Sequence, residues 1–363
     1  MFCKQKEYRV LGMMSGTSLD GVDLAYCSFH RDDSARWHYK IICAETLPWE
    51  ETWQRAIHDA YYLQGPALME FHFRLGHEFG RKASRFIHKH GIQPDFIASH
   101  GQTIYHNPEA GYTFQAGSGA AIAAHTGLPV ICDFRSGDVA LGGQGAPLVP
   151  VGDLLLFGNY GACLNLGGFA NISHNDAMGR RIAYDICPAN MALNHLASLA
   201  GQPFDRNGEL AASGHLNQEL LEQMLGLEYF HQPPPKSLGR EWFEKKFLPI
   251  LHQHEISPSD ALRTANELIA ILVKKAAEKI AVPGNGILVT GGGARNSFLI
   301  QLLSETLDLP LVVPEPQLID FKEALIFAFL GVLYLEGEDN CLKEVTGARS
   351  SSIGGCLYRG RQD

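Results

Sequence analysis

Gly12-Met-Met-Ser-Gly-Thr-Ser-Leu-Asp-Gly-Val-Asp23 follows directly on the strand-like run of residues 8–11 and is the first of three glycine-rich loops in the chain. The other two are Leu164-Asn-Leu-Gly-Gly-Phe-Ala-Asn-Ile-Ser173 and Ile287-Leu-Val-Thr-Gly-Gly-Gly-Ala-Arg-Asn296. In each, a strand leads into a tight turn in which glycines let backbone N–H groups approach an anion closely. One such loop is common in proteins, but three of them predict a single nucleotide that is held from several sides.

The order of the strand-like and helical runs predicts two similar lobes. In the first half we expect strands at residues 8–11, 24–29, 39–47 and 96–100, with helix over residues 52–90. The pattern returns from residue 161, with strands at 162–166, 172–174, 182–186 and 286–290 and helices at 189–200, 216–225, 241–251 and 260–280. This α/β pattern resembles the ribonuclease-H-like unit of the actin and sugar-kinase superfamily.

Length and composition fit a two-domain globular protein. At 363 residues the chain exceeds the size at which one hydrophobic core usually suffices. We expect residues 1–150 plus 320–363 to form the first lobe and residues 151–319 the second. The net charge of -9 argues against a nucleic-acid-binding surface, which is normally basic. It does not argue against ATP, whose phosphates can be held by backbone amides and a metal ion.

Targeting and cysteine patterns predict a cytoplasmic protein. The first residues lack the apolar core of a signal peptide, and no apolar run approaches the ~18–20 residues that span a bilayer. The eight cysteines form no CxxC pair, so we expect reduced, buried thiols instead of disulfides or a zinc site. We therefore expect no membrane and no nucleic-acid partner.

The first loop offers two kinds of polar group. Ser15, Thr17 and Ser18 carry hydroxyls, while Asp20 and Asp23 are acceptors that suit a metal ion or a metal-bound water. A plain β-hairpin, whose Asp and Ser side chains satisfy its own backbone, explains the same residues equally well. The chain has no Walker Gly-x-x-x-x-Gly-Lys-Ser/Thr motif, which disfavours a P-loop fold.

A set of motifs along nearly the whole chain resembles the anhydro-N-acetylmuramic acid kinase family. They are the three glycine loops together with Ser99-His-Gly-Gln-Thr103, Asp133-Phe-Arg135, Gly142-Gly-Gln-Gly-Ala-Pro-Leu-Val-Pro150, Pro235-Lys-Ser-Leu-Gly-Arg240 and Val345-Thr-Gly-Ala348. The resemblance implies an actin- and hexokinase-like fold of two lobes with the nucleotide in an interdomain cleft. It implies that 1,6-anhydro-N-acetylmuramic acid, ATP and water give N-acetylmuramic acid 6-phosphate and ADP, in peptidoglycan recycling.

Asp185, in Ala183-Tyr-Asp-Ile-Cys-Pro-Ala-Asn190, matches the catalytic aspartate of this family. The resemblance implies that it ends a strand and acts as the base that activates water, as in an inverting glycosidase. Residues read without the family allow a helix N-cap for the segment after Pro188. The family commonly has Asp-Thr-Gly-Pro-Gly-Asn here, whereas this chain has Ile186, Cys187 and Ala189. The loss of two glycines reduces backbone freedom, so the nucleotide or sugar could be positioned differently near Asp185.

The sugar contacts implied by the resemblance are Thr103, Arg135 and Glu323. Arg135 suits the lactyl carboxylate because a guanidinium can bind it through two parallel hydrogen bonds; an ion pair with Asp133 or Asp138 is the alternative. Glu323 heads an apolar run, so it could instead be a carboxylate favoured by a helix N-terminus. His100 could also contact the sugar, but a buried histidine satisfied by backbone fits it better.

The nucleotide contacts implied by the resemblance come from all three loops. Asp20 is the expected Mg²⁺ ligand, and a homodimer is implied by the family alone. We expect the ATP contacts to be Gly16, Thr17, Ser18, Leu19, Asp20, Gly21, Val22, Asp23, Asn165, Gly167, Gly168, Gly291, Gly292, Gly293 and Asn296.

Two other functions fit parts of the same sequence. One is a hexosamine kinase that acts on a free 6-hydroxyl. The other is a nucleotide-binding regulatory protein with impaired catalysis, which only the departures next to Asp185 support.

Overall fold

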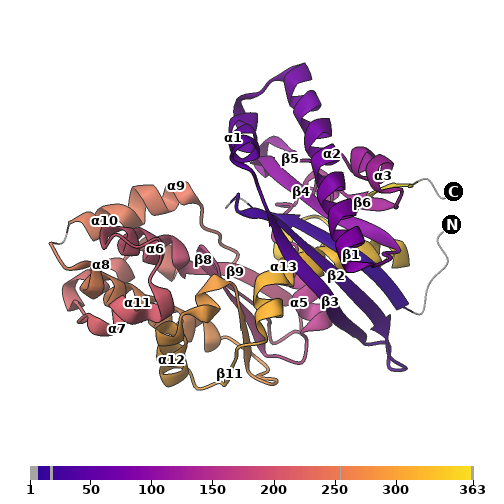
Figure 1. The fold of residues 1–363 in the computed structure, drawn as a ribbon. Helices are drawn as coiled ribbons and strands as arrows, with labels where there is room; N and C mark the ends of the chain where they lie inside the picture. Colours follow the sequence, from indigo (N-terminus) through magenta and orange to yellow (C-terminus); the bar gives the residue numbers. More distant parts are fainter. Residues whose placement is uncertain (1–6, 17–18, 254, 361–363) are drawn as a thin grey trace. The chain divides into compact units, whose positions relative to one another are not determined.

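The structure is a computed structural model that describes residues 7–16, 19–253 and 255–360. The chain divides into two compact units; Figure 1 colours the chain from its N-terminus to its C-terminus. Unit 1 comprises residues 1–156 and 321–363, and unit 2 comprises residues 157–320.

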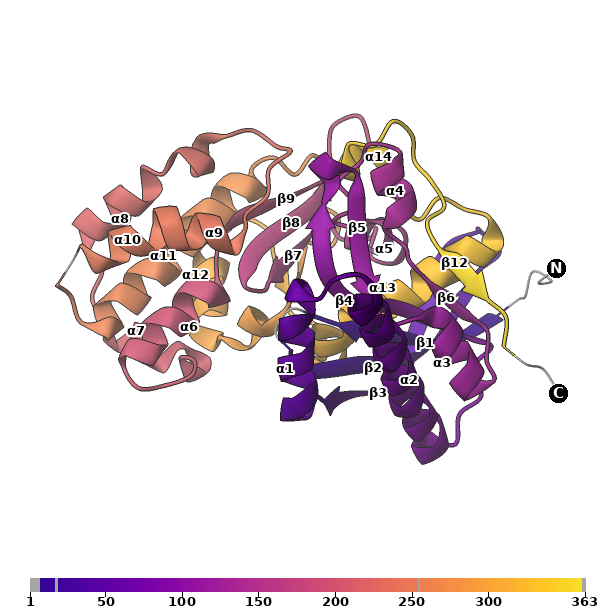
Figure 2. The same ribbon diagram turned by 90° about the horizontal axis from the view of Figure 1, so that it is seen from above.

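Unit 1 is built on a mixed sheet. Its strands are β1 Glu7–Ser15, β2 Gly21–Arg31, β3 Trp37–Pro48, β4 Phe96–Asn107, β5 Tyr112–Ala116, β6 Val130–Cys132 and β12 Cys356–Tyr358. The predicted meander is confirmed, because β1, β2 and β3 pair antiparallel in sequence order. β4 then lies parallel to β1, and β6 lies parallel to β4. The order is β12-β6-β4-β1-β2-β3, with β5 paired to β4; Figure 2 labels all seven strands.

The helices of unit 1 cover both faces of this sheet (Figure 2). They are α1 Glu51–Asp59, α2 Gly65–His90, α3 Gly119–Thr126, α4 Ser136–Ala140, α5 Val149–Leu156, α14 Lys343–Thr346 and the part of α13 Pro316–Glu336 from residue 321 on. The predicted helix over residues 52–90 is interrupted, because Leu63 and Gln64 take extended backbone between a 3₁₀ turn and α2.

Alternate residues of β1 serve opposite faces of the sheet, as the pleat requires. Leu11 and Met13 lie in the core formed with Phe71, Leu75 and Phe79 of α2, as the helical spacing predicts. Gly12, on the other face, lies directly against α13. The sheet therefore separates α2 from α13.

Unit 2 repeats the same arrangement around a five-stranded sheet. Its strands are β7 Ala162–Leu166, β8 Phe169–Asn175, β9 Arg181–Pro188, β10 Ile287–Thr290 and β11 Leu311–Val312, in the order β11-β10-β7-β8-β9. β7, β8 and β9 pair antiparallel, and β10 lies parallel to β7. In both units the first four strands follow the order third, second, first, fourth; the next strand along the sheet is β6 in unit 1 and β11 in unit 2. The predicted α/β fold with two ribonuclease-H-like lobes is confirmed.

The four helices predicted for unit 2 form close to the expected positions, as α6 Asn190–Leu199, α8 Gln218–Leu225, α9 Arg240–Trp242 with α10 Leu248–His252, and α11 Pro258–Ala277. The structure adds α7 Glu209–Ser213 and α12 Ser297–Thr306, which were not predicted. The run expected as one helix over residues 241–251 includes a π-helical turn, Phe243–Phe247, between α9 and α10. α11 buries one face, including Leu262, Leu268 and Ile269, in the core of this unit.

The cysteines described by the structure are all free thiols, in agreement with the prediction of reduced cysteines. The expected burial is wrong for Cys356, which is exposed on β12, the last strand of the chain. Among the described helices, none is both long enough and apolar enough to cross a bilayer.

Candidate functional site

The first glycine loop joins β1 to β2. Ser15 is buried and donates a hydrogen bond to Gln102 Oε1 at 2.6 Å, while Trp49 Nε1 donates to Ser15 Oγ at 3.4 Å. Ser15 therefore fixes β1 to β4 and does not present its hydroxyl to a ligand. The predicted ligands Thr17 and Ser18 lie outside the described residues. Gly16 and Leu19 flank them, and Leu19 N lies 3.5 Å from Gly16 O.

The end of the loop combines exposed and buried positions. Asp20 is exposed, whereas Val22 is fully buried in the core and can offer a ligand only its backbone. Gly21 packs so closely on β3 that an added Cβ would lie 2.6 Å from Leu47 O. Asp23 accepts a hydrogen bond from Thr46 Oγ1 at 2.6 Å. Ser15 and Asp23 thus bind side chains of neighbouring strands, and Asp20 is the exposed carboxylate of the loop.

Asp20 suits the magnesium ion of a nucleotide complex. Mg²⁺ keeps several waters and binds one or two carboxylates together with the substrate phosphates. Within the described residues no group of three His, Cys, Asp or Glu side chains could hold a metal ion by itself. Asp20 is thus one exposed carboxylate beside the glycine loop, of the type that Mg²⁺ can bind.

Gly12 sets the position of Glu323. An added Cβ at Gly12 would lie 2.0 Å from Ala324 O, so only glycine allows α13 to approach β1 this closely. The expectation that Gly12 permits the turn is wrong, because it lies inside β1. Glu323 lies well inside α13, after Pro316–Lys322, so the helix N-terminal interpretation of this residue is also wrong.

Charged groups of unit 1 act on one another around Glu323. Desolvation by the surrounding protein raises the pKa of the Glu323 carboxyl, the Arg135 guanidinium acts in the opposite direction, and the Asp23 carboxylate adds to the rise. Desolvation also lowers the pKa of Arg135 to about 10. The fold thus brings together two predicted sugar contacts, Arg135 and Glu323, with Asp23 of the first loop.

Arg135 is held by two neutral acceptors. Its Nε and Nη2 lie 3.0 and 2.9 Å from His100 Nε2, and its Nη1 donates to Gly145 O at 2.7 Å. His100 Nδ1 lies 2.9 Å from Gly101 O, so the neutral ring donates there and accepts from Arg135. Burial and the Arg135 charge lower the pKa of His100 to about 3, which keeps this ring neutral.

This geometry decides between the interpretations of Arg135 and His100. Asp133 accepts from Ser136 Oγ at 2.5 Å, and Asp138 binds Gly145 N and Thr346 Oγ1. The ion-pair alternative for Arg135 is therefore wrong within the described residues. A guanidinium has five N–H donors, and three are used, which leaves one on Nη1 and one on Nη2. His100 is a buried acceptor for Arg135.

Thr103 lies on β4 beside a small cavity of about 180 Å³. Leu19 of the first loop, Gln102 and Thr103 line this cavity together with Tyr61 of the segment after α1. Thr103 Oγ1 lies 3.4 Å from Gln115 Nε2 and is only partly exposed. Its hydroxyl can accept from Gln115 while it donates to a ligand in the cavity.

In unit 2 the second and third glycine loops meet at the start of α6. Asn190 Nδ2 donates to Leu166 O at 2.9 Å, and Asn190 N donates to Gly167 O at 3.0 Å. Gly291 has a φ of 82°, and an added Cβ would lie 2.6 Å from Asn165 Oδ1. The fold therefore brings together the predicted nucleotide contacts Asn165, Gly167, Gly168, Gly291, Gly292 and Gly293.

Asn296 has a structural role that the prediction did not include. Its Oδ1 accepts a hydrogen bond from Leu299 N at 3.0 Å and caps α12. Asn296 is 9% exposed, so little of its side chain can reach adenosine. Its predicted contact with the nucleotide stays a prediction.

Asp185 lies within β9 and is positioned by a neighbouring loop. Its Oδ2 accepts from Leu238 N at 2.8 Å, its backbone N–H donates to Lys236 O at 3.2 Å, and Tyr229 OH donates to Asp185 O at 2.8 Å. Its Oδ1 has no partner among the described residues. Desolvation raises the pKa of the carboxyl, and the Leu238 N–H acts in the opposite direction.

Asp185 neither ends a strand nor caps a helix. β9 continues to Pro188, so Asp185 does not end the strand, and Ala189 occupies the N-cap position of α6. The helix-cap alternative for Asp185 is therefore wrong. Ile186, Cys187 and Ala189, the departures from the family pattern, are all buried in the core of unit 2.

Sequence reasoning did not identify the residues that hold Asp185 and Arg135. Tyr229 and the backbone of residues 236–238 fix Asp185. Residues 236–238 belong to the family motif Pro235-Lys-Ser-Leu-Gly-Arg240, but that motif did not indicate a contact with Asp185. Asp205 and Asn207 belong to a polar turn, because Asp205 accepts hydrogen bonds from Leu210 N and Ala211 N.

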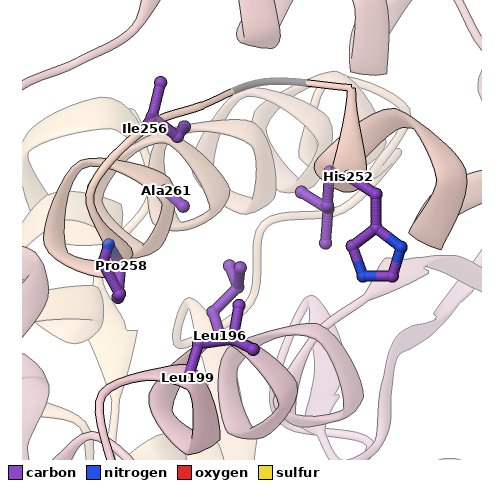
Figure 3. Close-up of a pocket in the computed structure, with 7 residues that line it drawn as sticks. Leu196, Leu199, His252, Ile256, Pro258 and Ala261 are labelled. Atoms are coloured by element: carbon purple, nitrogen blue, oxygen red, sulfur yellow. The ribbon is translucent and has the colours of Figure 1, made fainter.

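A second cavity lies in unit 2, and none of the predicted site residues lines it (Figure 3). Its volume is about 290 Å³, and its lining is apolar apart from His252. The lining residues are Leu196, Leu199, Leu251, His252, Ile256, Pro258 and Ala261.

Comparison with known proteins identifies the family. The family model described as anhydro-N-acetylmuramic acid kinase matches residues 8–360. A protein named anhydro-N-acetylmuramic acid kinase from Xanthomonas oryzae pv. oryzae (strain MAFF 311018) is 36% identical over 367 residues, covering 96% of each chain. Its namesake from Caldanaerobacter subterraneus subsp. tengcongensis is 33% identical over 384 residues, covering 97% of each chain.

Among solved structures, Plasmodium falciparum glycerol kinase with ADP aligns with a TM-score of 0.46 at 9% identity, covering 98% of this chain and 94% of that chain. The match of the family model to residues 8–360 and the two relatives above, each 33% or more identical, cover nearly the whole sequence. The chain therefore belongs to the anhydro-N-acetylmuramic acid kinase family and is an enzyme of the kinase class.

Proposed function

We propose that this kinase opens the anhydro bridge of 1,6-anhydro-N-acetylmuramic acid with water and phosphorylates O6, giving N-acetylmuramic acid 6-phosphate and ADP. Membership of a kinase family supports ATP as the phosphoryl donor. The observation that carries the proposal is Asp185, whose Oδ2 is held by Leu238 N while Oδ1 has no partner among the described residues.

Asp185 acts as the general base of the first step. Its Oδ1 takes a proton from water, the water oxygen bonds to C1, and the bond between C1 and O6 breaks. O6 then bonds to the γ-phosphorus of ATP, and the bond to the leaving β-phosphate oxygen breaks to release ADP. The hydrogen bond to Leu238 N fixes the direction of the carboxylate, which such a proton transfer requires.

Unit 1 supplies the sugar contacts in this proposal. The two remaining N–H donors of Arg135 bind the lactyl carboxylate as a bidentate pair. Glu323 accepts from a sugar hydroxyl, and Thr103 donates to the sugar from the cavity edge. Because His100 stays neutral, Arg135 carries the positive charge that attracts the lactyl carboxylate.

The glycine loops supply the nucleotide contacts. Backbone groups of residues 16–23 and of Asn165, Gly167 and Gly168 hold phosphates, and Gly291, Gly292 and Gly293 with Asn296 flank the adenosine. Asp20 would hold Mg²⁺, which when bound would supply positive charge to neutralise the phosphates. We place the enzyme in peptidoglycan recycling in the cytoplasm, as a homodimer.

Oxygen-18 water tests the proposed chemistry. Purified protein is incubated with 1,6-anhydro-N-acetylmuramic acid, ATP and Mg²⁺ in labelled water, and the product is read by mass spectrometry. We expect one oxygen-18 atom at C1, none in the phosphate, and loss of turnover in Asp185→Asn with retained ATP binding. Unlabelled N-acetylmuramic acid 6-phosphate incubated in the same water measures the background exchange at C1.

Each rival function gives a different result in this assay. A hexosamine kinase would phosphorylate N-acetylmuramic acid and leave the anhydro sugar unchanged. A regulatory protein would bind ATP without sugar-dependent release of ADP. Near-normal turnover in Asp185→Asn would remove Asp185 from the mechanism.

A further inference from the structure

The buried carboxylate of Asp138 is linked to Arg135 through Gly145, which hydrogen-bonds to both side chains. Asp138 is fully buried, and both of its oxygens are used. Its Oδ2 accepts from Gly145 N at 2.8 Å, and its Oδ1 accepts from Thr346 Oγ1 at 2.8 Å. Gly145 is also the residue whose carbonyl oxygen accepts from Arg135 Nη1 at 2.7 Å.

The loop of residues 142–145 is shaped around this carboxylate. An added Cβ at Gly143 would lie 2.2 Å from Asp138 Oδ2, and Gly145 has a φ of 66°. Gly143 N donates to Asp138 O at 2.9 Å, and Gln144 N donates to Thr346 O at 2.8 Å. The loop is thus fixed from two sides, by α4 through Asp138 and by α14 through Thr346.

Thr346 completes the arrangement because its hydroxyl has only one proton. Leu342 O lies 3.2 Å from Thr346 Oγ1, whereas Asp138 Oδ1 lies at 2.8 Å. The shorter contact to a charged acceptor is the stronger one. Thr346 is 1% exposed, so water does not compete for this bond.

We propose that Asp138 and Thr346 are positioning residues that set the enzyme's preference for a sugar bearing a carboxylate. They fix Gly145, its carbonyl fixes Arg135 Nη1, and the remaining N–H donors on Nη1 and Nη2 then face the carboxylate in a defined orientation. The inference rests on the proposed function, in which Arg135 binds the lactyl group. Asp138 and Thr346 touch neither sugar nor nucleotide.

The test compares two sugars that differ in the lactyl group. Dissociation constants are measured by calorimetry for 1,6-anhydro-N-acetylmuramic acid and for 1,6-anhydro-N-acetylglucosamine, which has no carboxylate. We expect wild type to bind the first sugar about 10- to 100-fold more tightly, the range for hydrogen bonds to a charged group. Thr346→Val and Asp138→Ala should each reduce this preference about tenfold or more, while binding of the second sugar changes little.

Matched variants separate positioning from general stability. Thr346→Ser keeps the hydroxyl, and Asp138→Asn keeps an acceptor for Gly145 N, so both should retain most of the preference. Asp133→Asn changes the neighbouring exposed carboxylate and should leave it unchanged. If Asp138→Ala does not fold, Thr346→Val carries the test alone.

Two results would overturn the inference. Equal weakening of both sugars in Thr346→Val would assign these residues a purely structural role. An unchanged preference in folded Thr346→Val would remove them from the positioning of Arg135. Wild-type protein that binds neither sugar, or shows no preference, would instead refute the proposed substrate and the role of Arg135, and the inference would fall with them.

Discussion

Replacing Gly12 with alanine should damage catalysis from a distance, because this position sets how closely α13 approaches β1. The added Cβ would lie 2.0 Å from Ala324 O, 2.9 Å from Ala324 C and 3.0 Å from Ala328 Cβ. These are atoms of a helix backbone and of a buried methyl, so no flexible side chain can give way. The helix itself has to move.

The required movement is large for a packed interior. Restoring an ordinary contact of 3.4 Å to Ala324 O needs a shift of about 1.4 Å, and Glu323 moves with its neighbour. Overpacking of this kind costs about 1–3 kcal/mol of unfolding free energy. A misplacement of about 1 Å in a positioning residue can lower the rate about 100-fold. We expect both effects in Gly12→Ala.

The assay measures urea unfolding and steady-state kinetics on the same preparations. Gly137→Ala is the matched control, because the nearest atom to its added Cβ is Gly354 Cα at 4.0 Å. It should keep or raise stability and keep kcat/KM. Gly12→Ala protein that is as stable and as active as wild type would refute the claim that this contact positions Glu323.

Two further predictions concern unit 2. Desolvation raises the pKa of Asp185, and the base must be ionised to act. In the pH profile of kcat/KM, the pKa of the acid limb should therefore lie above the ordinary aspartate value of ~3.9. His100, with a pKa of about 3, stays neutral in this pH range. A flat pH profile down to about pH 4 would contradict this. Gly291→Ala should weaken ATP binding and lower stability by about 1–3 kcal/mol, because its Cβ meets Asn165 Oδ1 at 2.6 Å and its φ is 82°. Gly292→Ala, with a nearest contact of 3.4 Å, should keep its stability; equal losses of unfolding free energy would show that the close contact is not the cause.

The strands and helices were predictable because their signals are local. Strand-like runs in the order of two meanders, and helical spacing at Phe71, Leu75 and Phe79, specify elements without reference to distant residues. The break at Leu63 and Gln64 has a local signal that the prediction overlooked, because Gly65-Pro66 follows directly. A Gly-Pro pair marks a helix boundary, and proline fits the first turn of the helix that begins there.

The sequence predicted which residues belong to the site, but not which groups hold those residues in position. Glycine loops and the family motifs locate Arg135, Asp185 and the nucleotide loops in the sequence. The acceptors that orient them are backbone carbonyls and a histidine, such as Gly145 O and His100 Nε2, and a backbone group carries no signature in the sequence. Gly12 shows the same problem, since a glycine needed for a helix contact looks identical to one needed for a turn.

The side chains that depart from the family pattern beside Asp185 are accommodated in the core of unit 2. Cys187 pairs with Ala170 in the sheet and is fully buried, and Ala189 is fully buried with a φ of -122°. Since that φ is negative, this position does not need the left-handed conformation that favours glycine. Ile186 also points into the core. The three side chains therefore fill space in the core of unit 2.

Restoring glycine at either position tests this explanation. Ala189→Gly removes a buried methyl and adds freedom to the unfolded chain, so it should lower the unfolding free energy by about 1–2 kcal/mol. Cys187→Gly leaves a larger void and should cost more. If the side chains only fill the core, kcat stays within a few-fold of wild type in both variants. A large rise in kcat in either variant would mean that Cys187 or Ala189 restrains Asp185, and the impaired-enzyme alternative would then have support from the structure.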